Sequence, residues 1–217
     1  MKTYTSIPHM TPPGRKKNEI HTALNITAFD KPDGSNIRAE WHPKRGFYKF
    51  GSRKCLIDGT HEQLGKAVTL VQDTYADELG RIFKDQRWNK SVVCFFEFYG
   101  PRSFAGNHHE DDDHKVTLFD VSPHKQGMIP PRDFIKLFAD VGIPSVLYRG
   151  IADDGFVASV ENSTLDGMTL EGVVCKAANP NGKKTSQPIM FKIKSKNWLN
   201  MLREFVNYDE ALFQRLM

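Results

Sequence analysis

The stretch that decides the fold is an apolar run followed at once by a polar turn. It reads Ala23-Leu24-Asn25-Ile26-Thr27-Ala28-Phe29 and then Asp30-Lys31-Pro32-Asp33-Gly34-Ser35-Asn36. The alternation of apolar and polar residues over 23–29 predicts a strand. Gly34, among Asp, Ser and Asn residues that favour turns, predicts a tight turn directly after it. A lysine therefore lies at a strand end, although the turn alone is equally compatible with a plain hairpin loop.

The same kinds of pattern continue along the chain. Further strands are expected over residues 37–41, 47–50, 91–99, 115–121, 146–149, 170–176 and 189–194. Apolar residues at three- and four-residue spacing predict helices over 60–84, 131–141 and 198–216, the first with Thr60 and Gln63 as a capping box and the last broken near Asn207. Strands from both ends of the chain interleave with helices, which indicates an α+β fold of mixed or antiparallel sheets with flanking helices. No long linker is visible, so residues 1–217 are expected to form a single domain.

The composition of the chain argues against membrane-spanning, secreted and disulfide-rich proteins. The chain has 217 residues and a net charge of +4. No apolar run approaches the roughly 18 residues that a membrane helix needs, and the N-terminal residues lack the apolar segment of a secretion signal. Three sparse cysteines form neither a disulfide framework nor a zinc motif, so they are expected to be small buried apolar residues. A cytoplasmic, monomeric protein without membrane contact is the expectation, with the His- and Asp-rich run 108–114 as a flexible loop.

Carboxylates and lysines recur on or beside the predicted strands. Glu97 lies within an aromatic strand, and Glu171 precedes a glycine on an apolar one. A buried carboxylate is costly unless a cation, a metal or hydrogen-bond donors satisfy it. Lys192 and Lys194 are two residues apart, so both point to one face of their strand. Two ammonium groups on one face repel each other unless they share an anion, and phosphate fits that role.

These residue types suit a lysine that takes up a nucleotidyl group. A nucleophilic lysine needs a lowered pKa, which neighbouring cations are expected to give Lys31. Attack on a phosphate that releases pyrophosphate needs cations and in-line geometry. Carboxylates can hold the magnesium ions that neutralise the developing charge.

Six short motifs in this order resemble the covalent nucleotidyltransferase superfamily of polynucleotide ligases and RNA capping enzymes. They are Lys31-Pro32-Asp33-Gly34, Ser52-Arg53, Glu97-Phe98-Tyr99-Gly100, Leu118-Phe119-Asp120-Val121, Glu171-Gly172-Val173-Val174 and Lys192-Ile193-Lys194-Ser195. The resemblance covers about residues 23–200. Asn36, five residues after the lysine, replaces the arginine usual in DNA ligases and resembles the RNA ligase 2 family. The resemblance implies the nucleotidyltransferase domain of such a ligase, with an ATP-grasp-like fold.

The resemblance also implies roles for individual residues. Lys31 would form lysyl-AMP, Lys192 and Lys194 would hold the α-phosphate, and Asn36 would assist the sealing steps. The implied ATP-binding residues are Asp30, Arg53, Glu97 and Phe119, with Phe119 stacked on adenine, and the implied metal ligands are Glu97 and Glu171. Two departures stand out: Asp30 replaces the glutamate common in RNA ligases, and Asp33 is closer to DNA ligases.

The activity that follows is that of an ATP-dependent RNA ligase with magnesium or manganese as cofactor, joining 5′-phosphate and 3′-hydroxyl ends or nicks in a role such as phage-like RNA repair. Only 23 residues follow Lys194. This length leaves no room for the C-terminal oligonucleotide-binding-fold or helical domain that relatives carry, which indicates a natural minimal enzyme or a truncated one. A minimal ATP-dependent DNA ligase, a GTP-using capping enzyme and a non-catalytic module that binds nucleic-acid ends remain alternatives.

Overall fold

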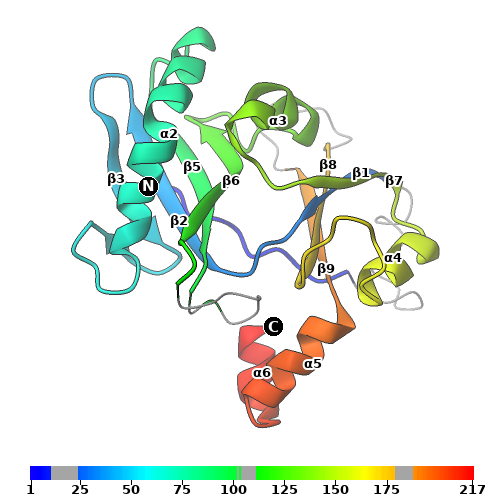
Figure 1. Ribbon diagram of the computed structural model, residues 1–217. Coiled ribbons are helices and arrows are strands. Elements are labelled where there is room, and N and C mark those ends of the chain that lie inside the picture. Colours follow the sequence, from blue (N-terminus) through cyan, green and yellow to red (C-terminus); the bar gives the residue numbers. More distant parts are fainter. Residues whose placement is uncertain (11–23, 102, 104–110, 179–187) are drawn as a thin grey trace.

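Two antiparallel sheets form the body of the protein in a computed structural model that describes residues 1–10, 24–101, 103, 111–178 and 188–217. Figure 1 shows the two sheets side by side, each covered by helices. The four-stranded sheet has the order β7 (Val146–Ile151), β1 (Asn25–Asp30), β8 (Gly172–Ala177) and β9 (Ile189–Lys194). The five-stranded sheet has the order β4 (Leu56–Ile57), β3 (Gly46–Ser52), β2 (Ser35–His42), β5 (Val92–Tyr99) and β6 (Lys115–Pro123). The predicted α+β class with antiparallel sheets is confirmed.

The long helix α2 (Gly65–Asp85) covers one face of the five-stranded sheet. Its buried residues recur at helical spacing and include Val68, Val71, Tyr75 and Leu79, which pack into the main apolar core. The predicted start at Thr60 is wrong. Thr60 instead donates from its backbone N–H and its hydroxyl to Asp58 Oδ1, at 2.9 and 2.6 Å. This local turn competes with helix formation, so the helix begins five residues later.

The four-stranded sheet has a second core on its outer side. Ile26, Phe191 and Ile193 pack there against Phe156 and Val160 of α4 (Asp154–Glu161). The sequence analysis missed this helix, although Asp153 is a good capping residue. The Asp153 side chain accepts a hydrogen bond from the Phe156 N–H and satisfies the first turn.

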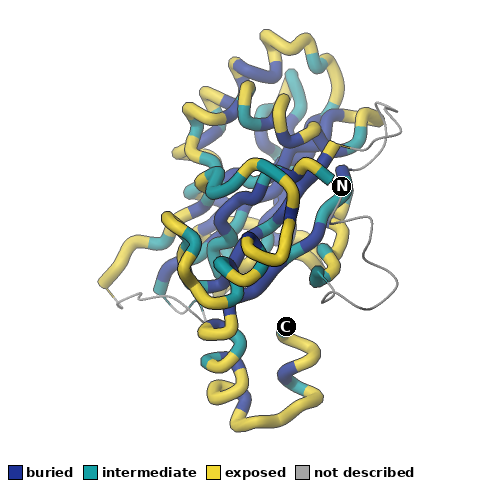
Figure 2. Tube along the Cα trace, turned by 90° about the vertical axis from the view of Figure 1, so that its right-hand side faces the viewer, coloured by how far each residue is buried: buried dark blue, intermediate teal, exposed yellow. Residues whose placement is uncertain are grey.

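The remaining helices are α3 (Pro131–Phe138), followed by a 3₁₀ turn η1 (Ala139–Val141), and the pair α5 (Lys196–Phe205) and α6 (Glu210–Leu216). The predicted break near Asn207 is confirmed, because Asn207 and Tyr208 both adopt positive φ angles, 50° and 60°. Trp198, Leu202 and Phe213 hold the pair together. Figure 2 shows α5 and α6 projecting from the body with most of their surface exposed.

The expectation for the cysteines holds in part. Cys94 and Cys175 are buried, but Cys55 is exposed in the turn between β3 and β4, so its prediction as a buried residue is wrong. Of the run 108–114, residues 108–110 lie outside the described residues, and residues 111–114 precede β6 without helix or strand structure. None of the helices in the described residues combines the length and the apolar character that crossing a membrane requires.

Candidate active site

One ion-pair network lies where three neighbouring strands of the four-stranded sheet begin or end, and it consists of Lys31 after β1, Glu171 before β8 and Lys194 at the end of β9. Lys31 Nζ lies 2.6 Å from Glu171 Oε2, and Lys194 Nζ lies 3.0 Å from Glu171 Oε1. Each carboxylate oxygen therefore has its own lysine. The side chain of Glu171 is only 3% exposed, so two ammonium groups offset the cost of burying its charge.

The strand order explains why these three residues meet. β8 pairs with both β1 and β9, with Asp30 opposite Val173 and Gly172 opposite Lys194. The Lys31 N–H donates to the Gly172 carbonyl at 3.0 Å, and the Ser195 N–H donates to the Glu171 carbonyl at 3.0 Å. Gly172 has φ 134°, and a Cβ there would lie 2.1 Å from the Ile193 carbonyl oxygen. Only glycine allows this approach, which is why a glycine follows the motif glutamate.

The expectation that cations lower the pKa of Lys31 is wrong for this structure. Burial does act to lower the pKa of Lys31, but the charges of Glu171, Glu97 and Asp33 outweigh it and raise that pKa above its usual value. Lys31 is thus held as an ammonium ion. A partner that draws charge away from the carboxylates is needed before Lys31 can act as a nucleophile.

Lys192 and Lys194 share one face of β9, while Phe191 and Ile193 point into the core behind it, as predicted. Burial, followed by the charges of Lys194 and Lys31, lowers the pKa of Lys192 to about 8. Burial also lowers the pKa of Lys194, opposed by Glu171. Lys192 Nζ donates to the Met217 carbonyl oxygen at 2.9 Å, and Lys194 Nζ lies 3.5 Å from the centre of the Trp198 ring. The two lysines are therefore an electrostatically frustrated pair that an added anion would stabilise.

Asn36 and Glu97 lie opposite each other on β2 and β5 of the five-stranded sheet. Burial, opposed by the charge of Lys31, raises the pKa of Glu97 to about 7. The Asn36 Oδ1 atom is buried and has no hydrogen-bond partner among the described residues. A buried orphan acceptor and a carboxylate with incomplete charge compensation both indicate that this position is built to meet another group.

Phe119 on β6 lies beside a buried ion pair that the sequence analysis missed. Lys176 Nζ donates to Asp120 Oδ2 and to the Phe119 carbonyl oxygen, both at 2.8 Å. Lys176 is on β8 and Asp120 on β6, so the pair joins the two sheets. The available signal was a charged residue in the interior of each of two largely apolar strands.

Asp30 and Arg53 are placed differently. Asp30 is buried, and its Oδ1 accepts from the backbone N–H and the hydroxyl of Thr169, at 2.9 and 3.0 Å. Arg53 is exposed in the turn between β3 and β4, yet its charge contributes to the shifts at Glu97 and Lys192. Direct contacts thus unite Lys31, Glu171 and Lys194. Glu97 and Lys192 interact with this network through their charges, whereas the Asp30 side chain and Phe119 contact other groups.

The residues present fit a divalent cation only together with a ligand. Within the described part of the chain, no group of three or more His, Cys, Asp and Glu side chains gathers as a metal site. Both oxygens of Glu171 are taken by lysines. Burial is the main cause of the raised pKa of Glu97, and the charges of Lys31 and Arg53 offset it only in part, so this carboxylate can accept a further cation. Magnesium commonly binds one or two carboxylates, with phosphate oxygens and water completing its shell.

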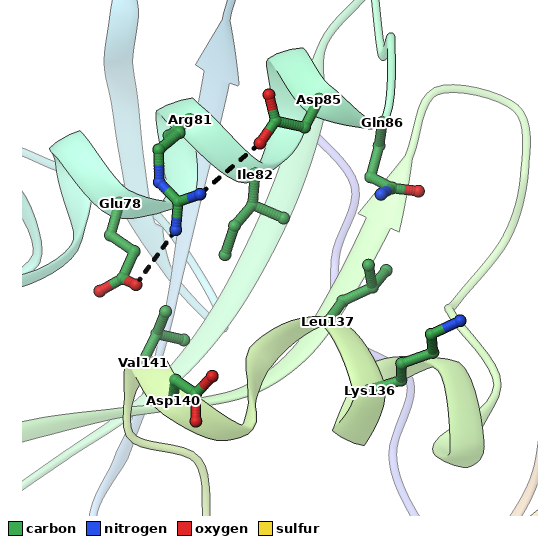
Figure 3. Close-up of a pocket in the computed structure, with 9 residues that line it drawn as sticks. All are labelled: Glu78, Arg81, Ile82, Asp85, Gln86, Lys136, Leu137, Asp140 and Val141. Carbon is green, nitrogen blue, oxygen red and sulfur yellow. Dashed lines mark ion pairs between the residues drawn. The ribbon is translucent and has the colours of Figure 1, made fainter.

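A separate surface hollow carries no such chemistry. It lies between α2 and the segment formed by the end of α3 and η1, and has a volume of about 220 Å³. Figure 3 shows Arg81 spanning Glu78 and Asp85 on its rim, at 3.6 Å from each carboxylate. None of the motif residues lines it, and the ion pairs at its rim lie on one exposed helix face. We therefore place the candidate site at the lysine network.

Comparison with solved structures agrees with this fold. A variant of the Naegleria gruberi RNA ligase without ligand has a TM-score of 0.66 at 13% identity, covering 93% of this chain and 58% of the other. Variants of that ligase with AMP and Mn and with ATP and Mn give TM-scores of 0.64 and 0.63 at 14% and 15% identity, covering 92% and 90% of this chain and 57% of the other in both cases. The chain thus spans less than three fifths of the length of these structures. No curated protein sequence matches it as a relative.

The sequence profile of one family matches residues 25–194. That range begins at β1 and ends at Lys194, so it holds the whole lysine network, the Glu97 strand and Phe119. Most of the chain and all of the candidate site therefore lie inside the match. On this ground the chain belongs to the RNA ligase family.

Proposed function

We propose that this chain is the adenylyltransferase part of an ATP-dependent RNA ligase that joins 5′-phosphate and 3′-hydroxyl ends through a lysyl-AMP intermediate. The observation that carries the proposal is the network in which Lys31 and Lys194 share Glu171 at adjoining strand ends. A lysine at hydrogen-bond distance from a carboxylate, beside two further ammonium groups, has the parts that attack on a phosphate ester requires.

In the first step Lys31 Nζ loses a proton and bonds to the α-phosphorus of ATP. The bond from that phosphorus to the oxygen bridging to the β-phosphate breaks, and pyrophosphate leaves. Glu171 Oε2, at 2.6 Å, is the nearest acceptor for the proton in the network. Lys192 and Lys194 hold the α-phosphate, which relieves their mutual repulsion.

A bound divalent cation would neutralise carboxylate charge near Lys31, and so lower the pKa of that lysine and offset the charge of the leaving pyrophosphate. Glu97 is the residue with free capacity to hold it. Glu171 would contribute only if one of its lysines turned to the phosphate, which is the exchange that ATP binding invites.

In the later steps AMP passes from Lys31 to a 5′-phosphate, and a 3′-hydroxyl then attacks that phosphate and releases AMP. Asn36 lies next to Glu97 across the strands, with its orphan Oδ1 available to a donor. A ribose hydroxyl is such a donor, and it is the group that distinguishes RNA from DNA. This is why we favour RNA ends or nicks as the substrate.

The decisive experiment uses the protein with ATP or GTP labelled at the α-phosphate and magnesium, followed by denaturing electrophoresis. We expect label on the protein with ATP only. The adenylated protein is then given matched RNA and DNA nicks, and RNA sealing is expected to be faster. Labelling by GTP would favour a capping enzyme, faster DNA sealing would favour a DNA ligase, and no label from either nucleotide would favour a non-catalytic end-binding module.

A further inference from the structure

Residues 1–10 form a strap that ties the two sheets together. On the five-stranded sheet, Lys2 Nζ donates to Ser122 Oγ at 2.9 Å. At its other end the strap adds to the edge of β9, where the Lys192 N–H donates to the Pro8 carbonyl and the Met10 N–H to the Lys192 carbonyl, both at 2.9 Å. Figure 1 shows this segment, in the darkest blue, running from the five-stranded sheet towards the four-stranded one.

Tyr4 is the central contact of the strap. It is 9% exposed, and its ring centre lies 5.0 Å from those of Phe95 and Phe119. Its ring is nearly perpendicular to that of Phe119, with an angle of 89°. Edge-to-face contacts of this kind fix the orientation of both rings. The Tyr4 hydroxyl also lies 3.4 Å from the sulfur of Met190 on β9, so one side chain contacts both sheets.

The Tyr4 hydroxyl completes the ion pair beneath Phe119. It donates to Asp120 Oδ2, the same oxygen that accepts from Lys176. The Asp120 Oδ1 atom is buried without a partner among the described residues, so both donors converge on one oxygen. Lys176 in turn binds the Phe119 carbonyl at 2.8 Å. Tyr4 therefore restrains Phe119 twice, through its ring and through the Asp120–Lys176 pair under its backbone.

We propose that Tyr4 is a positioning residue for the nucleotide site, and that the strap holds Phe119 in the orientation needed to receive the base. The proposal rests on the proposed function, together with the adenine-stacking role that the family resemblance implies for Phe119. It predicts that loss of Tyr4 weakens nucleotide binding without removing a group that takes part in the chemistry, because Tyr4 acts through Phe119 and Asp120.

The first test separates KM from kcat in self-adenylation. Tyr4→Leu removes both restraints and should raise the KM for ATP about tenfold, as expected for loss of one aromatic pair with its hydrogen bond, while the rate at saturating ATP stays within about twofold. Tyr4→Phe keeps the ring and should raise the KM by about threefold. The matched control is Tyr75→Phe. Tyr75 is a buried tyrosine of α2, which packs on the other face of the five-stranded sheet, and its hydroxyl lies 3.0 Å from the Val116 and Gly142 carbonyl oxygens. It should lower the melting temperature and leave the KM unchanged.

The second test does not depend on the reaction. ATP binding is measured by titration calorimetry in the Lys31→Ala background, with and without Tyr4→Leu, and the expected loss in affinity is again about tenfold. If the wild-type chain is not adenylated but this loss appears, the proposed function fails and the role of Tyr4 stands. Equal affinity with and without Tyr4 would overturn that role, as would no ATP binding to Lys31→Ala protein with its strap intact. Tighter binding by Tyr4→Leu would overturn it too, by showing that the ring stands where the base must go.

Discussion

Two buried lysine–carboxylate pairs invite comparison, because they are chemically alike and differ in access to solvent. In the pair between Lys31 and Glu171 the side chains are 23% and 3% exposed, and in the pair between Lys176 and Asp120 they are 4% and 1% exposed. The first lies at strand ends, and its carboxylate is shared with Lys194. The second lies between the sheets beneath the rings of Phe29, Phe119 and Phe134. The open pair can exchange partners with a ligand, whereas the sealed pair has no access to one and acts only by holding neighbouring groups in place.

The largest expected effect is on the open pair. Lys31→Ala should reduce self-adenylation by at least about 10⁴-fold, because no other group can replace the covalent nucleophile. Lys31→Arg keeps the positive charge beside Glu171 and should be equally inactive. The measurement is mass spectrometry of the peptide containing Lys31 after treatment with ATP. AMP carried by Lys31→Ala protein would remove Lys31 from its assigned role.

The sealed pair should show the largest effect on stability. Lys176→Met leaves the Asp120 charge buried beside Tyr4 and should lower the free energy of unfolding by about 3–5 kcal/mol. Lys31→Met should cost much less, about 1–2 kcal/mol, since Glu171 keeps Lys194 and the site is open to water. Urea unfolding of both variants tests this ranking.

A double variant keeps this comparison testable if Lys176→Met does not fold. Adding Asp120→Asn removes the second charge and leaves an acceptor for the Tyr4 hydroxyl, so part of the lost stability should return. If Lys31→Met and Lys176→Met lowered the free energy of unfolding by similar amounts, the difference in solvent exposure would not determine how much each pair stabilises the fold.

The sequence predicted the open pair better than the sealed one, for physical reasons. Lys31 and Glu171 each stand beside a turn or a glycine, where polar residues are informative. Lys176 and Asp120 each stand inside an apolar strand, and only the relative placement of the two sheets brings them together. That placement is a long-range property with no local sequence signal. The strap was missed for the same reason, because its strand-like pairing depends on the edge of β9.

Element boundaries show a similar division. The strands around Lys31, Glu97 and Lys194 were predicted correctly because β-branched and aromatic residues dominate them. The start of α2 was wrong because Asp58 and Thr60 form a local turn that competes with capping. The predicted direction of the pKa shift of Lys31 was also wrong. The sequence shows which charged residues exist, but it does not show that Glu171 lies nearer to Lys31 than Lys192 does.

An intermediate effect is expected for the lysines that flank the open pair. Lys192→Ala and Lys194→Ala should each slow self-adenylation by about 10²-fold, and the double variant should be slowed by less than the product of the two. The non-additivity follows from their shared anion. Lys194→Ala should also lower the melting temperature more than Lys192→Ala, because only Lys194 is paired with Glu171. Single-turnover rates with labelled ATP give the first comparison, and strictly multiplicative effects would show that the two lysines act separately.

The smallest effect concerns Glu97, which lies near the open pair without a lysine of its own. Its pKa is raised to about 7 in the folded protein, mainly by burial, from an unfolded value of 4.5. The folded state therefore binds more protons than the unfolded state between these two values, so this residue makes stability fall as pH rises from 4.5 to 7. Because Glu97 is partly exposed, screening should limit the change to about 1–2 kcal/mol.

Urea unfolding at pH 4.5, 6 and 8, compared between the wild type and Glu97→Gln, isolates this contribution, since all other titrating groups are shared. The variant should lose less stability over this range than the wild type does. Magnesium with ATP should reduce this difference between the two proteins. A cation bound at Glu97 would compensate the charge of the buried carboxylate, which burial alone disfavours. Identical pH profiles for the two proteins would show that the Glu97 carboxylate is already satisfied, and would leave the metal without its best ligand in this site.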